Sequence, residues 1–418
     1  MARHLPAPLR WPLDLGRRLV DLLGPTGGAA RQSMVALVLN STTSFIAGAT
    51  LGSITGTLEA LPGLLVMVPA AIGLRGNIFG TLGNRLSTSI HTGTFRVSFR
   101  RESVMGQNVL AATVLTFVLS LGLAVVARVV AAGFGVENTI SVLDLALISV
   151  VGGVLASVVL LGATLLLTIG AVRRGWDLDN LVAPSTATLG DVITIPSLFL
   201  ATFLVGRGSV STVLAWLMVA LSIGVFVSAL RSRMAELRRI VWESLPVLSA
   251  AVVLSTLAGV AVQKQLSIFA ALPALLVLEP AFVSSAGALG GILSSRVSTN
   301  LHLGLVEPTL RPGREVRRDA SVVALLGLPV FIFNGVGAHY VAVALGESSP
   351  GLGWMVLCSL IGGAAAVAFV IGLAYYGTIA AWSADLDPDT YGIPVVTASV
   401  DFVGAVALIV TILALGIA

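Results

Sequence analysis

The chain has 418 residues, of which 56% are hydrophobic and only 11% are charged, and its mean hydropathy is +1.00. This composition excludes a soluble globular domain and indicates an all-α polytopic membrane protein. The formal net charge is +4, but the basic residues lie in short connecting segments, so we expect no nucleic-acid partner. Cys358 is the only cysteine, which excludes a disulfide framework and a cysteine-based metal site.

Residues 1–32 carry five Arg but no apolar core of a cleaved signal peptide, and we expect a basic cytoplasmic N-terminal segment there. After this segment come about eleven apolar runs, several of which reach the ~20 residues that cross a ~30 Å hydrocarbon layer as a helix. The expected spans are 33–54, 57–74, 108–132, 142–172, 184–205, 210–230, 245–263, 267–285, 319–343, 352–378 and 392–416.

Arg residues gather in alternate connecting segments. These segments are the N-terminal tail, 75–101 (which Arg75 opens), 173–174, 231–239 and 296–318. Because cytoplasmic loops are enriched in Arg and Lys, this bias predicts a cytoplasmic N-terminus and an external C-terminus in a plasma or inner membrane.

An internal repeat runs through the chain. The segment 83-GNRLSTSIHTG-93 aligns with 294-SSRVSTNLHLG-304 at an offset of 211, and 177-DLDNLVAPSTATLGD-191 aligns with 387-DPDTYGIPVVTASVD-401 at an offset of 210. We therefore expect two five-helix repeats, 33–208 and 241–418. The linking segment 209–240 contains an extra span, which makes the repeats parallel and related by a pseudo-two-fold axis along the membrane normal. A monomer would then imitate a symmetric dimer.

Two acidic residues fall inside predicted spans at matching positions. Asp191 and Asp401 each lie seven residues after the proline that begins the span, or about 10 Å into the helix. An intramembrane carboxylate normally faces the protein interior or a wet path. Two carboxylates that flank a symmetry axis repel one another unless a cation lies between them. The pair predicts a cation site on a central pore, whereas the alternative is that each Asp only forms hydrogen bonds within its own repeat.

Other acids are candidates for the same pathway. Glu279 has no acidic counterpart, since its equivalent is Val68, and it either holds a second or coupling ion or satisfies backbone freed by Pro280. Loop acids at the expected mouth of the pore either concentrate cations or cap helices. They are Asp177, Asp179, Asp385, Asp387 and Asp389.

The stretch 76-GNIFGTLGNRLSTSIHTG-93 is rich in small and polar residues. Its glycines either allow close helix packing or break the helix and expose carbonyls to a cavity. Asn77 and Asn84 are candidate pore residues, and their counterparts Ala288 and Ser295 lack the amide. His91 and His302 fit interfacial hydrogen bonding better than metal binding.

The proline-containing helix followed by "GNIFGTLGNRLST", together with the later Asp-rich stretch, resembles the membrane domain of MgtE-type magnesium transporters. Two such domains in one chain resemble the related eukaryotic magnesium solute carriers. The resemblance implies that Mg²⁺ is bound by Asp191 and Asp401, with backbone carbonyls of Ala187 and Thr397 one turn earlier. We expect no feedback of the kind given by cytoplasmic CBS sensor domains.

The sequence thus favours a Mg²⁺ transporter, either channel-like or coupled to Na⁺ or H⁺, without a cofactor. A transporter of Ca²⁺, Mn²⁺ or Co²⁺ is the first alternative, because the candidate ligands are all oxygens. An intramembrane aspartyl enzyme and a non-transporting scaffold are remote alternatives, since neither requires a duplicated chain with a buried acid pair. We therefore do not expect an enzyme.

Overall fold

The fold was analysed in a computed structural model, which describes residues 27–91, 93, 95, 97–98, 100–174, 178–384 and 393–417. Within these ranges, only the backbone is described for 27–30, 91, 171, 173–174, 178–187 and 393–394. Most of the expected N-terminal segment lies outside the described residues.

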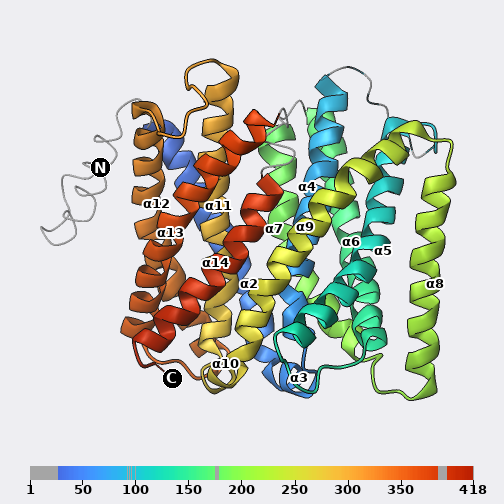
Figure 1. The fold of residues 1–418 in the computed structure, drawn as a ribbon, viewed down its shortest axis with the longest axis horizontal. Coiled ribbons are helices and arrows are strands. Elements are labelled where there is room, and N and C mark those ends of the chain that lie inside the picture. Colours follow the sequence, from blue (N-terminus) through green and yellow to red (C-terminus); the bar gives the residue numbers. More distant parts are fainter. Residues whose placement is uncertain are drawn as a thin grey trace, which may run out of the picture.

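The described residues form an all-helical bundle without strands (Figure 1). Long apolar runs explain this, because a backbone in lipid must satisfy its hydrogen bonds within the segment. In chain order the helices are α2 (Gly27–Ser53), α3 (Thr55–Ala60), α4 (Leu64–His91), α5 (Val104–Gly133), α6 (Val142–Arg174), α7 (Leu178–Thr202), α8 (Ser209–Arg231), α9 (Ala235–Lys264), α10 (Leu266–Ala271), α11 (Ala274–His302), α12 (Arg314–Ala344), α13 (Leu352–Ser383) and α14 (Ile393–Ala414).

Ten of the described helices are long and apolar enough to cross a membrane. The eleventh long helix, α7, covers 25 residues, and its segment Thr188–Thr202 is apolar. The polytopic all-α prediction is confirmed, and the helices match the expected spans to within several residues at most ends.

The prediction of a connecting loop that begins at Arg75 was wrong, because Arg75 lies inside a helix. Helix α4 continues without a break from Leu64 to His91, through the glycine-rich stretch, and its counterpart α11 continues to His302. Two apolar runs that were expected as single spans, 57–74 and 267–285, instead each divide into a short helix, α3 or α10, and the beginning of the long helix that follows, α4 or α11. Packing explains the continuity: Ile78, Phe79 and Leu82 are almost fully buried, so tertiary contacts override the weak helix propensity of Gly and Asn.

Arg75 therefore lies inside the bundle and not in a connecting loop. It is 1% exposed, and its guanidinium donates hydrogen bonds to the hydroxyls of Ser120 in α5 and Ser157 in α6. Its Nε has no partner among the described residues. In the second half, the equivalent positions are the apolar residues Ala286, Phe331 and Val367.

The order of helices in α2–α7 recurs in α9–α14, with α8 between them. The first helix of each set packs mainly against the other set: α2 contacts α11 and α12, and α9 contacts α4 and α5. In addition, α2 contacts α7, the last helix of its own set, and α9 contacts α14, the last helix of its own set. The two halves are thus interleaved, while α8 lies at the edge of the bundle (Figure 1).

Close backbone approach explains how these helices interleave. A Cβ added at Gly48 of α2 would lie 2.3 Å from the carbonyl oxygen of Val277 in α11. A Cβ added at Gly259 of α9 would lie 2.2 Å from that of Val66 in α4. Both the glycines and the valines are equivalent at the offset of 211. Only glycine permits these two contacts.

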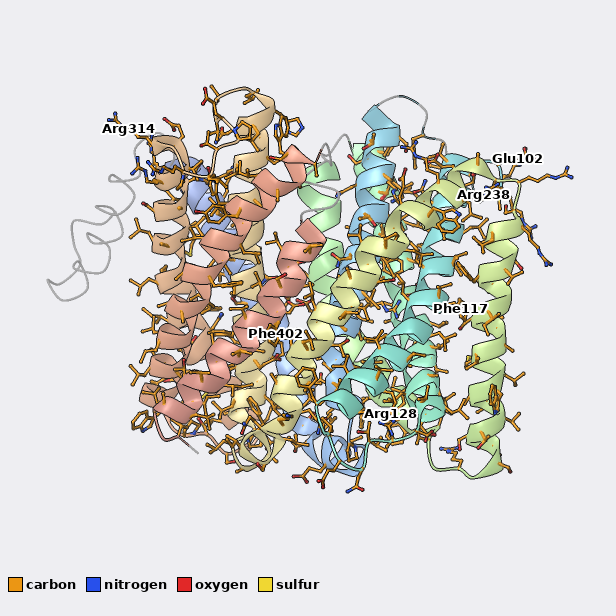
Figure 2. The ribbon with its side chains drawn as sticks, in the orientation of Figure 1. Glu102, Phe117, Arg128, Arg238, Arg314 and Phe402 are labelled. Atoms are coloured by element: carbon orange, nitrogen blue, oxygen red, sulfur yellow. The ribbon has the colours of Figure 1, made fainter. Side chains whose placement is uncertain are left out.

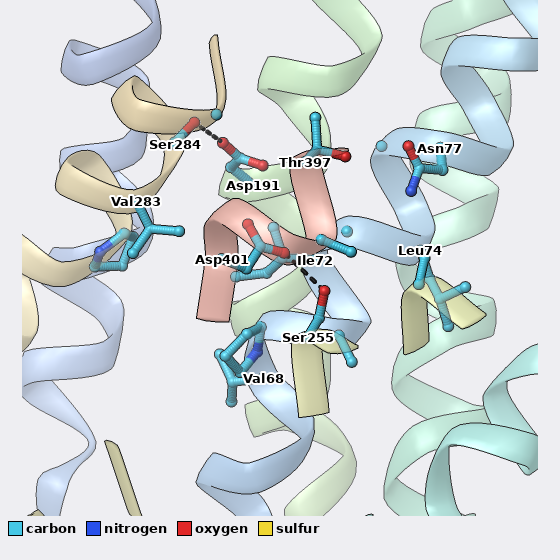
Figure 3. Close-up of a pocket in the computed structure, with 18 of the residues that line it drawn as sticks. Val68, Ile72, Leu74, Asn77, Asp191, Ser255, Val283, Ser284, Thr397 and Asp401 are labelled. Atoms are coloured by element: carbon cyan, nitrogen blue, oxygen red, sulfur yellow. Dashed lines mark hydrogen bonds between the residues drawn. The ribbon is translucent and has the colours of Figure 1, made fainter. Parts of the chain in front are cut away.

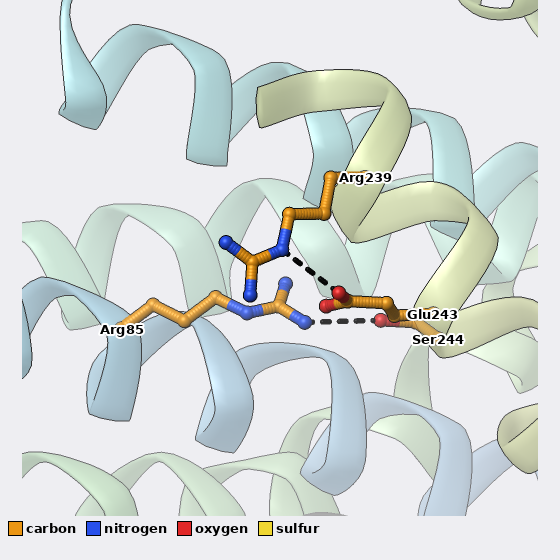
Figure 4. A network of polar contacts seen from close by, with 4 residues as sticks. All are labelled: Arg85, Arg239, Glu243 and Ser244. Atoms are coloured by element: carbon orange, nitrogen blue, oxygen red, sulfur yellow. Dashed lines mark hydrogen bonds and ion pairs between the residues drawn. The ribbon is translucent and has the colours of Figure 1, made fainter. Parts of the chain in front are cut away.

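Charged residues mark the ends of the bundle. Arg238, Arg314 and Glu102 lie at one end and Arg128 at the other (Figure 2). At the Arg-rich end, Arg85 of α4 donates to Ser244 of α9 at 3.2 Å, beside the Arg239–Glu243 ion pair of 2.8 Å (Figure 4). The equivalent Arg296 instead pairs with Asp319 at 3.0 Å, so the two halves differ at this end.

Candidate cation site

A cavity of about 350 Å³ lies where the two halves meet. Side chains or backbone from six helices line it: α2, α4, α7, α9, α11 and α14. The prolines of the two central helices, Pro69 and Pro280, are both part of its wall. A cavity at this position with acidic residues in its wall is a place where a cation can be held inside a membrane domain.

Asp191 of α7 and Asp401 of α14 both line this cavity (Figure 3). Each accepts a hydrogen bond from a serine at an equivalent position: Ser44 donates to Asp191 Oδ2 at 3.3 Å, and Ser255 donates to Asp401 Oδ2 at 2.7 Å. These serines lie on α2 and α9, the helices that cross between the halves. The structure thus places both carboxylates in the wall of one cavity.

The surroundings of the two carboxylates differ. Ser284 of α11 also donates to Asp191 at 3.2 Å and is itself hydrogen-bonded to the amide of Asn40. Position 73, which is equivalent to Ser284, is a glycine, and a Cβ there would lie 3.8 Å from Asp401 Oδ2. Glu279 has no counterpart in the first half and lines the cavity near Asp401, with 7% of its surface exposed.

Other predicted site residues are placed as follows. Thr397 and Asn77 line the cavity, whereas Asn84 is exposed and lies outside the lining. Ala187 lies on α7 one turn before Asp191, but its side chain, like that of Asp179, is outside the described set. Asp177, Asp385, Asp387 and Asp389 fall outside the described residues.

From the sequence, Glu279 was expected either to hold a second or coupling ion or to satisfy backbone groups freed by Pro280. Among the described residues, no hydrogen bond joins its carboxylate to the backbone near Pro280 or to any other group. Instead it lines the same cavity as the two aspartates. An ionised carboxylate that is buried without a partner is costly, so Glu279 either holds a proton or is accompanied by a cation.

Several polar residues of the site were missed by the sequence analysis: Asn40, Ser44, Ser255 and Ser284. Serine in an apolar helix usually bonds to its own backbone, as Thr42 does to the carbonyl of Val38 at 2.7 Å, so its presence alone carries no signal. One signal was available, because Ser44 and Ser255 are equivalent at the same offset of 211 as the Arg/His motifs.

The charge and spacing of these groups determine what the cavity can bind. Among its described lining residues, three are acidic and none is basic. Yet no three His, Cys, Asp or Glu side chains of the described chain lie close enough to enclose a bare metal ion. A cation held there would keep much of its water shell and meet carboxylate, hydroxyl and amide oxygens, which are the ligands of hard cations.

An apolar helical bundle with a cavity that contains three acidic residues is typical of a multi-pass membrane protein that transports cations. A sequence model of the MgtE family, described as divalent cation transporters, matches residues 68–201 and 279–411. The chain belongs to this family. It is therefore a transporter and not an enzyme, as predicted.

Similar proteins are solute carriers of animals. Solute carrier family 41 member 3 of Mus musculus is 27% identical over 368 residues, which cover 82% of this chain and 73% of the relative. Solute carrier family 41 member 2 of Homo sapiens is 24% identical over 375 residues, which cover 82% of this chain and 63% of the relative. No solved structure matches the chain significantly.

Proposed function

We propose that the protein carries Mg²⁺ across the membrane through the cavity between its halves, with Asp191 and Asp401 holding the ion. One observation carries the proposal: these equivalent carboxylates line the same cavity, and each accepts a hydrogen bond from an equivalent serine. Membership of a divalent cation transporter family supports it. So does the resemblance to magnesium solute carriers.

The chemistry of the lining favours Mg²⁺ over softer metals. Mg²⁺ loses water reluctantly and is commonly bound through one or two carboxylates while it keeps several waters. The cavity offers carboxylate, hydroxyl and amide oxygens, and no sulfur or imidazole is among its described lining residues. Ca²⁺, Mn²⁺ and Co²⁺ are the competing cargoes, to be separated by the ion panel described below.

The proposal includes an arrangement of the whole chain. Residues 33–208 and 241–418 are two parallel repeats joined by 209–240, and a pseudo-two-fold axis along the membrane normal passes between Asp191 and Asp401. The recurring helix order and the two equivalent glycine contacts support this arrangement. Because one chain supplies both halves of the site, a monomer suffices for transport.

The direct test is Mg²⁺ flux into liposomes that contain the purified protein and a trapped Mg²⁺ indicator. We expect the double variant Asp191→Asn/Asp401→Asn to lower flux to that of protein-free vesicles, because the isosteric amides cannot balance the charge of the ion. Glu137→Gln, in an exposed loop, is the matched control and keeps full flux. Undiminished flux in the double variant would sink the proposal.

The same vesicles distinguish the finer alternatives. Competition by Ca²⁺, Mn²⁺ and Co²⁺ ranks the cargoes. An imposed Na⁺ or pH gradient that drives Mg²⁺ uphill shows coupling to that ion, whereas flux that only follows the Mg²⁺ gradient and the voltage shows a channel-like pathway.

A further inference from the structure

The two halves of the cavity share one feature and differ in the rest. In both, a serine of the crossing helix donates to the aspartate. Apart from these two serines, Asn40 and Ser284 form a hydrogen-bonded group with Asp191, whereas the positions equivalent to them near Asp401 carry no polar side chain. The cavity also has a third carboxylate without an equivalent, Glu279. This difference divides the site into two chemically distinct parts.

The part of the cavity around Asp191, here called the Asp191 half, contains Asn40 of α2 and Ser284 of α11. Ser284 Oγ lies 2.9 Å from Asn40 Nδ2 and 3.2 Å from Asn40 Oδ1, and it is also 3.2 Å from Asp191 Oδ2. The single hydroxyl proton of Ser284 can go to the Asn40 oxygen or to Asp191, but not to both. The Asn40 oxygen and the Asp191 carboxylate therefore compete for this proton, and both keep lone pairs that can accept hydrogen bonds from a hydrated ion.

The Asp401 half lacks both groups. The positions equivalent to Asn40 and Ser284 are Ala251 and Gly73, and both line the cavity. The cavity wall instead contains an additional carboxylate, that of Glu279, whose equivalent in the first repeat is Val68. This half offers more negative charge and fewer neutral acceptors.

These two kinds of group act differently on a hydrated cation. Attraction by a carboxylate depends on the charge of the ion, which Mg²⁺ and Ca²⁺ share. Neutral oxygens at fixed positions accept hydrogen bonds from the water shell, and they distinguish ions whose shells differ in size and rigidity, as those of Mg²⁺ and Ca²⁺ do.

We propose that Asn40 and Ser284 determine the selectivity of the site for Mg²⁺ over Ca²⁺, and that Glu279 supplies attraction that does not distinguish the two ions. This inference rests on the proposed function, because it assumes that a divalent cation enters the cavity. Under this proposal the two parts of the cavity have different roles, selectivity around Asp191 and unselective attraction at Glu279, although the two repeats are related in sequence.

The test compares the binding of Mg²⁺ alone and of Ca²⁺ alone to purified variants by titration calorimetry, with flux in liposomes as a second readout. We expect Asn40→Ala/Ser284→Gly to lower the Mg²⁺/Ca²⁺ preference about tenfold, the equivalent of one hydrogen bond to the water shell. We expect Glu279→Gln to weaken the binding of both ions by the same factor and to leave their ratio unchanged.

The repeat supplies a rescue experiment. A Cβ at Gly73 would lie 3.8 Å from both Asp401 Oδ2 and Ser255 Oγ, an ordinary contact distance, so a serine fits there. Adding Ala251→Asn/Gly73→Ser to the Asn40→Ala/Ser284→Gly variant moves the polar pair to the other half. We expect this quadruple variant to regain the preference for Mg²⁺ over Ca²⁺. A variant that had lost the preference only because it folds poorly would not regain it.

The outcomes separate the two proposals. If wild-type protein neither binds nor transports divalent cations, the proposed function fails. If wild-type protein prefers Mg²⁺ and Asn40→Ala/Ser284→Gly keeps that preference, only the selectivity inference is overturned. A change of ratio in Glu279→Gln, or no recovery in a folded quadruple variant, also overturns it.

Discussion

Arg75 shows how one residue can differ in function between two related halves. Its guanidinium is buried among α4, α5 and α6, with hydroxyl partners but no acid among the described residues. In the second half, the ring of Phe331 fills the corresponding space so closely that a Cβ at Gly363 would lie 2.4 Å from it. The same position in the fold therefore accepts either a buried cation or an apolar side chain.

This comparison predicts the stability of Arg75 variants. Replacing a buried charge by an apolar residue of similar volume is often neutral or stabilising. We expect Arg75→Met to keep or raise the temperature of thermal unfolding in detergent, measured by tryptophan fluorescence. Arg75→Ala should lower the free energy of unfolding by about 2 kcal/mol or more, because it leaves a void. Equal loss in both variants would show that the charge itself stabilises the fold.

At the scale of the helix, the sequence predicted apolar elements well and polar helical turns poorly. Runs of apolar residues located the long helices, because only helices can bury such runs in lipid. The sequence left two interpretations open for the stretch 76–91, close helix packing through its glycines or a break in the helix, and the structure has an unbroken helix there. Its helical structure depends on packing against α7 and α9, which no local pattern reveals.

The crossing helices give a prediction in two equivalent places. Gly48→Ala and Gly259→Ala each force a methyl group against a backbone carbonyl that cannot move independently. We expect each to lower the free energy of unfolding by about 1–3 kcal/mol, a typical overpacking cost, as measured by thermal unfolding in detergent. Gly224→Ala in α8, where a Cβ meets nothing within 4 Å, is the control and should not destabilise the helix. Tolerance of alanine at either crossing would contradict the interleaved packing.

At the scale of the whole molecule, duplication was the most informative feature of the sequence. It led to the prediction that Asp191 and Asp401 share one site, and both residues line the same cavity. It could not predict which residues break the symmetry. Asn40 and Ser284 come from different halves of the chain and meet only because α2 crosses to α11, so their pairing is a property of the tertiary fold.

Orientation in the membrane can be tested with reporter cysteines, because the only native thiol, Cys358, is buried and can be replaced by serine. The exposed residues Glu102 and Glu137 lie in the loops before and after α5, at opposite ends of that helix. The Arg bias predicts that Glu137→Cys reacts with an impermeant maleimide added to intact cells, while Glu102→Cys reacts only after permeabilisation. The reverse pattern would invert the topology.

The interleaving of the halves has a consequence for biosynthesis. Helix α2 ends at Ser53, but the helix it packs against, α11, ends at His302. At roughly 5–20 residues per second, the ribosome completes α11 some 10 to 50 s after α2. Throughout that interval the polar face of α2, with Asn40 and Ser41, lies in the membrane without its hydrogen-bond partners on α11. During synthesis, the membrane insertion machinery or the surrounding lipid must therefore accommodate the polar face of α2 until α11 has been inserted.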